Sequence, residues 1–161
     1  MTGWYPELRN AHRAHAQENQ AIEAKELALS IAQIIHDKHG EKISILDVSG
    51  PLVIADYFVV ASARNTRHAK AIASGVNQTM KQSGRLRRHT AGVDGDSNWV
   101  LLDFDSVVVH IFQEDARSFY DLESLWCDVP KEEFVPDSEP TEPAGDSQGT
   151  WESYPDSTST L

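Results

Sequence analysis

The most informative pattern of apolar and polar positions lies just beyond the middle of the chain. Two short apolar runs, Trp99–Phe104 and Val107–Phe112, are separated only by Asp105 and Ser106, which is the length and composition of a tight β-hairpin. Both runs are apolar at odd and even positions, so both faces of the hairpin are expected to be covered. The pattern therefore places this hairpin near the middle of a sheet rather than at an exposed edge.

The apolar period becomes helical directly after the hairpin. From Asp115 onward, Phe119, Leu122 and Trp126 recur on one stripe, and the acidic residues that open the segment suit the positive end of a helix dipole. We expect one helix here, with Trp126 in the core.

A first helix is predicted near the N-terminus. It runs from about residue 20 to a stop at Gly40, with apolar residues at helical spacing: Ala24, Leu27, Ala28, Ile31, Ile34 and Ile35. Residues 1–19 are polar and show no clear period, which predicts a flexible arm.

The region between the first helix and the hairpin predicts two strands, a helix and a further strand. The strands are Ile43–Val48 and Tyr57–Ala61, and the last is Arg85–Thr90. Asn65 is the expected cap of the intervening helix, which ends at Gly84. Its apolar face comprises Ala69, Ile72, Ala73, Val76 and Met80.

The order of these elements predicts a single α/β (α+β mixed) domain over residues 20–129. It has one mixed sheet of about five strands flanked by helices. Residues 130–161 are rich in Pro, Ser, Thr, Asp and Glu, which predicts an acidic, disordered tail.

Length and cysteine content narrow the protein class. A chain of 161 residues suits one domain, and the single cysteine, Cys127, excludes an intrachain disulfide and a cysteine-rich metal site. We find no apolar run long enough to span a membrane and no signal or transit peptide, so a cytoplasmic protein is expected.

The net charge of −11 is unevenly distributed. No Asp or Glu occurs between Asp56 and Asp94, whereas half of the 14 Lys and Arg residues lie in that window: Arg64, Arg67, Lys70, Lys81, Arg85, Arg87 and Arg88. With His68, the first three stand at a predicted helix start, which favours an anion. They could contact nucleic-acid phosphates or an acidic partner surface, or simply form a solvated face.

Several motifs together resemble one known family. They are DYFVVAS, RHAKAIA, VDG, WVLLD, VVVHIF and R-x-x-Y-x-LE-x-LW, which occur in this order between residues 56 and 126. Over about residues 20–128 the chain resembles the ribosomal silencing factor family, also called the Iojap family.

The resemblance implies a non-enzymatic factor that needs no cofactor. Such a factor binds the large ribosomal subunit through ribosomal protein number fourteen and blocks joining of the small subunit when nutrients are short. The resemblance also implies a fold similar to nucleotidyltransferases without their catalytic residues, and a homodimer when free. Family positions expected to bind the partner are Trp99, Asp103, His110, Arg117, Tyr120 and Glu123.

The sequence departs from the family pattern at two places. Asp105-Ser106 replaces the Gly-Asp that family members commonly have at the hairpin turn, and Asp94-Gly95 replaces Glu-Gly. The first change matters more, because Asp adopts a positive φ less readily than Gly.

Two other functions are left open by the residues themselves. Asp103 and Asp105 form a D-x-D pair of the kind that holds divalent metals in phosphoryl-transfer enzymes, so a nucleotidyltransferase-like enzyme is the alternative function. Asp105 also suits a turn, and the lone His110 suits either a hydrogen-bonded core residue or a general base or ligand. A purely dimeric scaffold is the third hypothesis.

Aromatic residues near the hairpin are the expected interface anchors. Trp99 starts its strand beside a loop, and Tyr120 lies off the main apolar stripe, so both are expected to be partly exposed.

Overall fold

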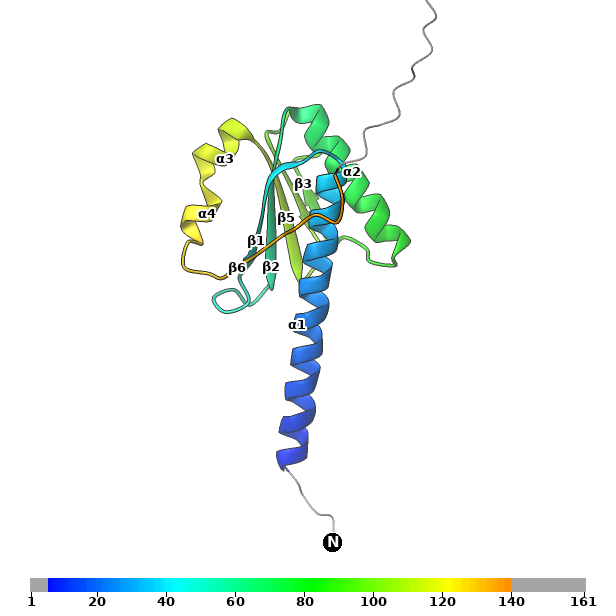
Figure 1. The fold of residues 1–161 in the computed structure, drawn as a ribbon, viewed down its shortest axis with the longest axis vertical. Coiled ribbons are helices and arrows are strands. Elements are labelled where there is room, and N and C mark those ends of the chain that lie inside the picture. Colours follow the sequence, from blue (N-terminus) through cyan, green and yellow to red (C-terminus); the bar gives the residue numbers. More distant parts are fainter. Residues whose placement is uncertain (1–5, 140–161) are drawn as a thin grey trace, which may run out of the picture.

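The structure is a computed structural model that describes residues 6–139, with side chains from residue 13 (Figure 1). Its elements are α1 (Pro6–Asp37), β1 (Glu41–Asp47), β2 (Tyr57–Ala63), α2 (Thr66–Gln82), β3 (His89–Ala91), β4 (Trp99–Asp103), β5 (Val107–Gln113), α3 (Glu114–Tyr120), α4 (Leu122–Leu125) and β6 (Lys131–Glu132).

The strands form one mixed sheet in the order β3-β4-β5-β2-β1-β6. Among the strands of residues 6–139, only the central pair, β2 and β5, is parallel, and the other neighbours are antiparallel. The predicted mixed α/β domain is confirmed. The predicted hairpin is also correct, since β4 and β5 pair directly and β5 lies inside the sheet. The sheet has six strands rather than about five, because β6 comes from the predicted tail.

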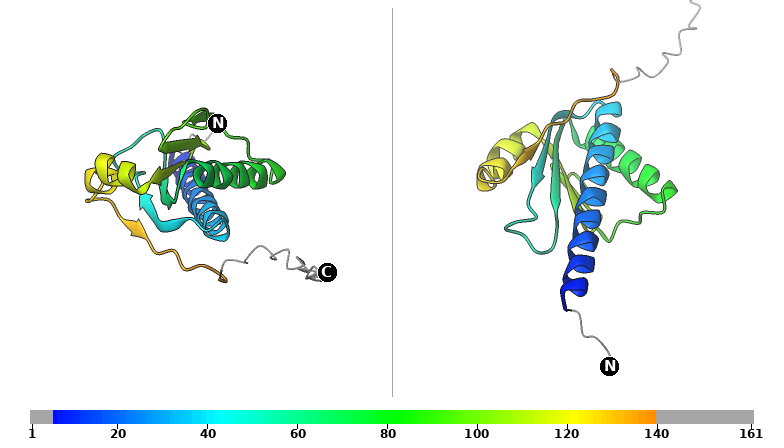
Figure 2. Two further views of the ribbon diagram at one scale, coloured as in Figure 1. Left: turned by 90° about the horizontal axis from the view of Figure 1, so that it is seen from above. Right: turned by 60° about the horizontal axis from the view of Figure 1, so that its bottom comes forward.

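Helices α1 and α2 cover one face of the sheet and enclose the main core (Figure 2). The apolar face predicted for α2 is confirmed residue by residue, because all five of its positions are buried. The predicted cap is also present, since Asn65 Oδ1 accepts a hydrogen bond of 2.8 Å from the backbone N–H of His68. This amphipathic helix explains why the main core lies on that face.

The opposite face of the sheet carries a smaller core beneath α3 and α4. Phe58, Val60 and Phe112 are buried in it, whereas Trp99 and Trp126 pack against it while partly buried. Trp126 therefore packs against a core, as predicted, but it lies at the edge of that core and is only partly buried. The second face is therefore less completely covered than the first. It holds half of the expected site residues, namely Trp99, His110, Arg117, Tyr120 and Glu123.

The N-terminal arm was predicted wrongly over most of its length. Helix α1 begins at Pro6, so residues 6–19 are helical, and the helix projects well beyond the sheet in Figure 1. The reason is composition, because Ala, Glu, Gln and Arg favour a helix even where no apolar period is present. Residues 1–5 lie outside the described residues.

The start of the acidic tail was also predicted wrongly. β6 pairs with β1 at Ile45 and Leu46, and Phe134 packs against the main core. Glu132 forms a salt bridge of 2.6 Å with Lys25 of α1. Residues 130–139 thus form a C-terminal strap across β1 and α1, whereas residues 140–161 lie outside the described part.

Two further predictions need correction. The strand expected at Arg85–Thr90 is confined to His89–Ala91, because residues 85–88 form an exposed connection after α2. The single helix expected from Asp115 is two short helices, because Asp121 adopts a left-handed conformation with φ 44° that ends α3. Phe119, expected on the buried stripe, is consequently 79% exposed.

None of the helices within residues 6–139 combines the length and apolar character that crossing a membrane requires.

Candidate functional site

An aromatic cluster lies on the second face of the sheet where β4, β5 and α3 meet. Trp99 of β4 is opposite Phe112 of β5, and their ring centroids are 4.9 Å apart. Tyr120 at the end of α3 brings its ring to 4.7 Å from that of Trp99. The Trp99 Nε1–H donates a hydrogen bond of 3.2 Å to Nδ1 of His110. Strand pairing thus brings together three residues that the sequence had singled out.

His110 is a core residue of this cluster. Its side chain is buried, and burial lowers its pKa to about 4, so the imidazole is neutral near pH 7. Because Nδ1 accepts from Trp99, the proton lies on Nε2, which has no hydrogen-bond partner among the described residues. The neutral ring orients Trp99 and is closed to solvent, which argues against a general base.

A buried ion pair holds α3 and α4 against the sheet. Arg117 is about 10% exposed and donates to Glu123 twice, with Nη2 at 2.6 Å from Oε1 and Nε at 3.1 Å from Oε2. Its Nη1 donates to Oγ of Ser62 on β2 at 2.8 Å, and Oγ of Ser44 on β1 donates to Glu123 at 2.7 Å. The hydrogen bonds from Arg117 lower the pKa of Glu123, although burial partly opposes the shift.

These contacts give Arg117 and Glu123 a positioning role. They lie six residues apart, on α3 and α4, and the left-handed residue Asp121 between the helices turns the chain so that the two side chains meet. Sequence reasoning missed their partners Ser44 and Ser62. The available signal was a small hydroxyl between apolar neighbours, since Ser44 lies between two Ile residues and Ser62 between two Ala residues.

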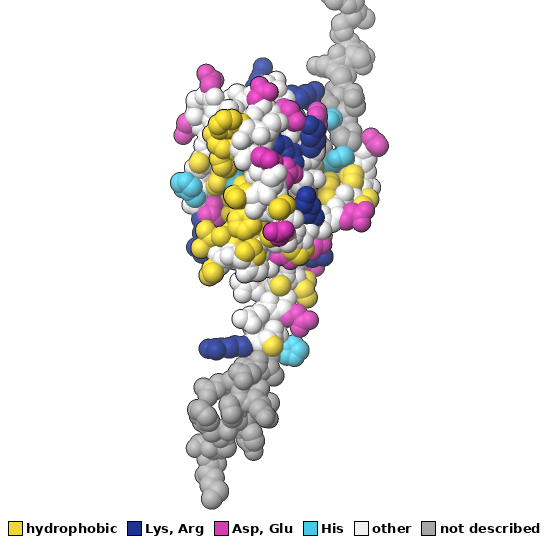
Figure 3. Space-filling model, turned by 90° about the vertical axis from the view of Figure 1, so that its left-hand side faces the viewer, with side chains coloured by type: hydrophobic (Ala, Val, Ile, Leu, Met, Phe, Trp, Pro, Cys, Tyr) yellow, Lys and Arg dark blue, Asp and Glu magenta, His cyan; other side chains and the backbone are white. Residues whose placement is uncertain are grey.

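The outer surface of α3 and α4 carries exposed apolar side chains, which we name the α3–α4 ridge: Phe119, Tyr120 and Leu125. Their exposed fractions are 79%, 50% and 75%. Figure 3, which views this side of the molecule, shows apolar side chains gathered over the face. Phe119 and Leu125 were not among the expected site residues, because the helix break that exposes them leaves no clear signal in sequence.

The basic residues do not gather into one patch. Arg64, Arg67 and Lys70 are at the start of α2, whereas Arg85, Arg87 and Arg88 follow its end, about 25 Å away for a helix of 17 residues. Neither group lies in the aromatic cluster.

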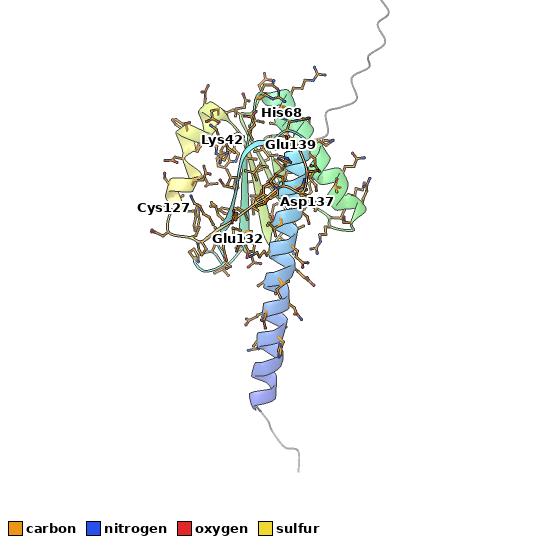
Figure 4. The ribbon with its side chains drawn as sticks, viewed as in Figure 1. Lys42, His68, Cys127, Glu132, Asp137 and Glu139 are labelled. Carbon is orange, nitrogen blue, oxygen red and sulfur yellow. The ribbon has the colours of Figure 1, made fainter. Side chains whose placement is uncertain are left out.

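His68 has a structural role at the start of α2. Its Nδ1 accepts from the backbone N–H of Arg64, and its Nε2 lies 2.8 Å from the carbonyl oxygen of Lys38. Figure 4 shows His68 near the top of the view and Cys127, which follows α4, at the left side of the domain. The contact between His68 and Lys38 therefore links the start of α2 to the end of α1.

The two acidic residues of the hairpin both form contacts at the turn. Asp103 Oδ1 accepts a hydrogen bond of 2.8 Å from the backbone N–H of Asp105, and the Asp105 carboxylate lies 3.1 Å from Arg88. Asp105 has φ 73°, a left-handed conformation that Gly adopts more readily than Asp. This arrangement gives both carboxylates partners other than a metal, and the described residues contain no group of three side chains suited to holding one.

Comparison with known proteins gives concordant results. The profile described as "Ribosomal silencing factor during starvation" matches residues 21–158. A protein of Bacillus subtilis named ribosomal silencing factor RsfS is 38% identical over 94 residues, covering 58% of this chain and 79% of that protein. A mouse protein named mitochondrial assembly of ribosomal large subunit protein 1 is 30% identical over 132 residues, covering 77% of this chain and 56% of that protein.

The fold comparison agrees with the sequence comparison. A crystal structure of a protein from Bacillus halodurans superposes with a TM-score of 0.58 at 29% identity, covering 70% of this chain and 98% of that one. Sequence and fold together show that the chain belongs to the ribosomal silencing factor family.

Proposed function

We propose that this protein represses translation by binding the large ribosomal subunit and sterically excluding the small subunit, with greatest effect under nutrient limitation. Its family membership supports this function. The single structural observation that carries it is the α3–α4 ridge, where three large apolar side chains are exposed on two successive helices.

The ridge has the physical properties of a binding surface. Burying a Phe or Leu side chain that is exposed in the free protein contributes roughly 1.5–3 kcal/mol. Tyr120 is backed by the ring of Trp99, and Arg117 and Glu123 fix the helices that carry the ridge. The surface is therefore ordered before binding, which lowers the entropic cost of association.

We propose ribosomal protein number fourteen as the direct partner, as the family resemblance implies. The net charge of −11 opposes broad contact with RNA, so a protein partner suits the ridge better. The basic residues at either end of α2 lie away from the ridge, and any contact that they make with ribosomal RNA is peripheral.

Exclusion of the small subunit requires no reaction, cofactor or metal. We place the protein in the cytoplasm together with ribosomes. We further propose that it forms a homodimer when free and that the dimer uses the same apolar ridge, so that dimerisation and ribosome binding compete.

The test is co-sedimentation of the purified protein with separated large and small ribosomal subunits on sucrose gradients, followed by a subunit-joining assay. Phe119→Ala is expected to weaken binding about 10-fold or more, because it removes a central apolar anchor. Leu86→Ala is the matched control, since Leu86 is 72% exposed on a different part of the surface.

We expect the wild-type protein to sediment with large subunits alone and to block subunit joining. Phe119→Ala is expected to lose both properties, and Leu86→Ala is expected to keep them. Equal binding by the two variants would exclude the ridge as the interface. Association with neither subunit at low salt would refute the proposed function itself.

A further inference from the structure

A groove between α1 and α2 lies on the side of the sheet opposite to the α3–α4 ridge. Its volume is about 630 Å³, which is in the range of ligand-binding clefts. Apolar lining comes from Leu29 and Ile34 of α1 and Met80 of α2. Among the described residues of the lining, Arg85 contributes the one cationic side chain, and Glu26 and Asp137 contribute carboxylates. The groove therefore suits apolar groups, and an acidic neighbour is favoured only where it reaches Arg85.

One wall of the groove belongs to the C-terminal strap. Phe134, Val135 and Asp137 line it, and the backbone N–H of Asp137 donates a hydrogen bond of 3.0 Å to the side chain of Gln33 on α1. The carbonyl oxygen of Ser138 lies 3.1 Å from His36 Nε2. Figure 4 shows Asp137 and Glu139 beside α1, so the described chain ends next to the groove.

The remaining residues contain both aromatic side chains and acids that could reach Arg85. Residues 140–161 contain four Asp or Glu residues and no Lys or Arg. Two of the acids flank the large aromatic residues in the sequence Trp151-Glu152-Ser153-Tyr154-Pro155-Asp156.

We propose that residues 151–156 of this chain dock in the α1–α2 groove. Trp151 and Tyr154 occupy its apolar part, and Glu152 or Asp156 pairs with Arg85. The inference concerns a surface remote from the ribosome-binding ridge, so it stands or falls independently of the proposed function.

Residues 140–150, which connect the C-terminal strap to the docking segment, form a tether that is long enough to reach the groove. Residues 140–150 span up to about 36 Å when extended, much more than is needed from a chain end that already borders the groove. A short tether gives an effective concentration in the millimolar range, so an intrinsic Kd near 0.1 mM would make the docked form about tenfold more abundant than the free form.

Charge placement distinguishes this docking from general attraction between an acidic tail and a basic surface. Arg85 lines the groove, whereas Arg87, two residues later, is exposed but does not line it. Reversing the charge at Arg85 is therefore expected to release the tail, and the same change at Arg87 is expected to leave it docked.

The experiment is ¹⁹F NMR of the full-length protein labelled with 5-fluorotryptophan. Trp151→Phe identifies the Trp151 resonance, and a synthetic peptide of residues 146–161 gives its undocked position. Variants Arg85→Glu and Val135→Glu alter the groove, and Arg87→Glu is the control. The resonances of Trp99 and Trp126, across the sheet, report whether each variant is folded.

The docked segment is expected to give a Trp151 resonance displaced from the peptide position in the wild type and in Arg87→Glu. That resonance should move to the peptide position in Arg85→Glu and Val135→Glu while Trp99 and Trp126 stay unchanged. The proposal is overturned if wild-type Trp151 already resonates at the peptide position, or if neither groove variant moves it. If Val135→Glu unfolds the protein, Arg85→Glu alone decides.

Discussion

The ion pair between Arg117 and Glu123 is expected to stabilise the fold measurably, unlike most salt bridges on protein surfaces. Removing one partner of a fully buried pair costs about 3–5 kcal/mol, because the other charge stays buried without compensation. Glu123 retains about 25% of its side-chain exposure, and Gln would keep one acceptor for Arg117. We therefore expect Glu123→Gln to lower the free energy of unfolding by about 2 kcal/mol at pH 7.

The loss of stability caused by Glu123→Gln should depend on pH in a defined direction. The hydrogen bonds from Arg117 hold the pKa of Glu123 below its ordinary value of 4.5. A carboxyl group with a lowered pKa in the folded state contributes its full stabilisation above the unfolded-state value and loses it as the pH falls through the folded-state value. The difference between the wild type and Glu123→Gln should therefore shrink as the pH falls below 4.5.

Urea unfolding followed by circular dichroism, from pH 7 to about pH 3, measures this difference. Glu114→Gln is the matched control, because Glu114 pairs with Lys42 at an exposed position on α3, the helix that carries Arg117. We expect no measurable loss of stability in the control. Equal losses in the two variants, or a Glu123→Gln deficit that does not change with pH, would contradict the role assigned to the buried pair.

Three further predictions concern other parts of the fold. Burial lowers the pKa of His110 to about 4, so wild-type stability should fall as the pH drops from 6.5 towards 4 by up to about 3 kcal/mol; urea titrations should show a flatter profile in His110→Phe. Asp105→Gly should stabilise the protein by about 0.5 kcal/mol in thermal unfolding, and Asp105→Ala should not, because only Gly adopts φ 73° without strain. Truncation after Asp128 should lower thermal stability by at least about 1 kcal/mol, because it removes β6 and Phe134; an unchanged melting temperature would show that the strap contributes nothing.

The sequence predicts best where local and long-range preferences agree. Helix α2 has a capping residue, Asn65, a regular apolar stripe and a Gly after its end, and its buried face was predicted in full. The hairpin of β4 and β5 was equally clear, because its apolar runs are separated only by Asp105 and Ser106. In both cases short-range chemistry specifies the element before any tertiary contact is considered.

The predictions from sequence were wrong where a contact with a distant part of the chain determines the local structure. Strand β6 has only two residues, and its place depends on the exposed edge of β1 and on Phe134 packing against the core. The break at Asp121 is favoured because it brings Glu123 to Arg117, a pairing that a continuous helix would not allow at a spacing of six residues. Neither contact can be read from the residues of the segment alone.

The candidate site was predicted in part. The structure brings Trp99, His110 and Tyr120 into one cluster and joins Arg117 to Glu123, because strand register and the α3–α4 break bring them together. The basic residues chosen with them lie elsewhere, because a window of like charge in sequence spans the whole length of α2. The exposure of Phe119 was not predicted, since an apolar residue at helical spacing is normally buried.

The parallel pairing of β2 with β5 has a consequence for how the protein is made. β2 is buried along its whole length, and the strand that completes its second edge begins only at Val107. A nascent chain that has not yet emerged to that point contains the antiparallel pair β1–β2 with one apolar edge uncovered. Synthesis halted in this interval would leave a fragment prone to aggregation rather than a smaller folded unit.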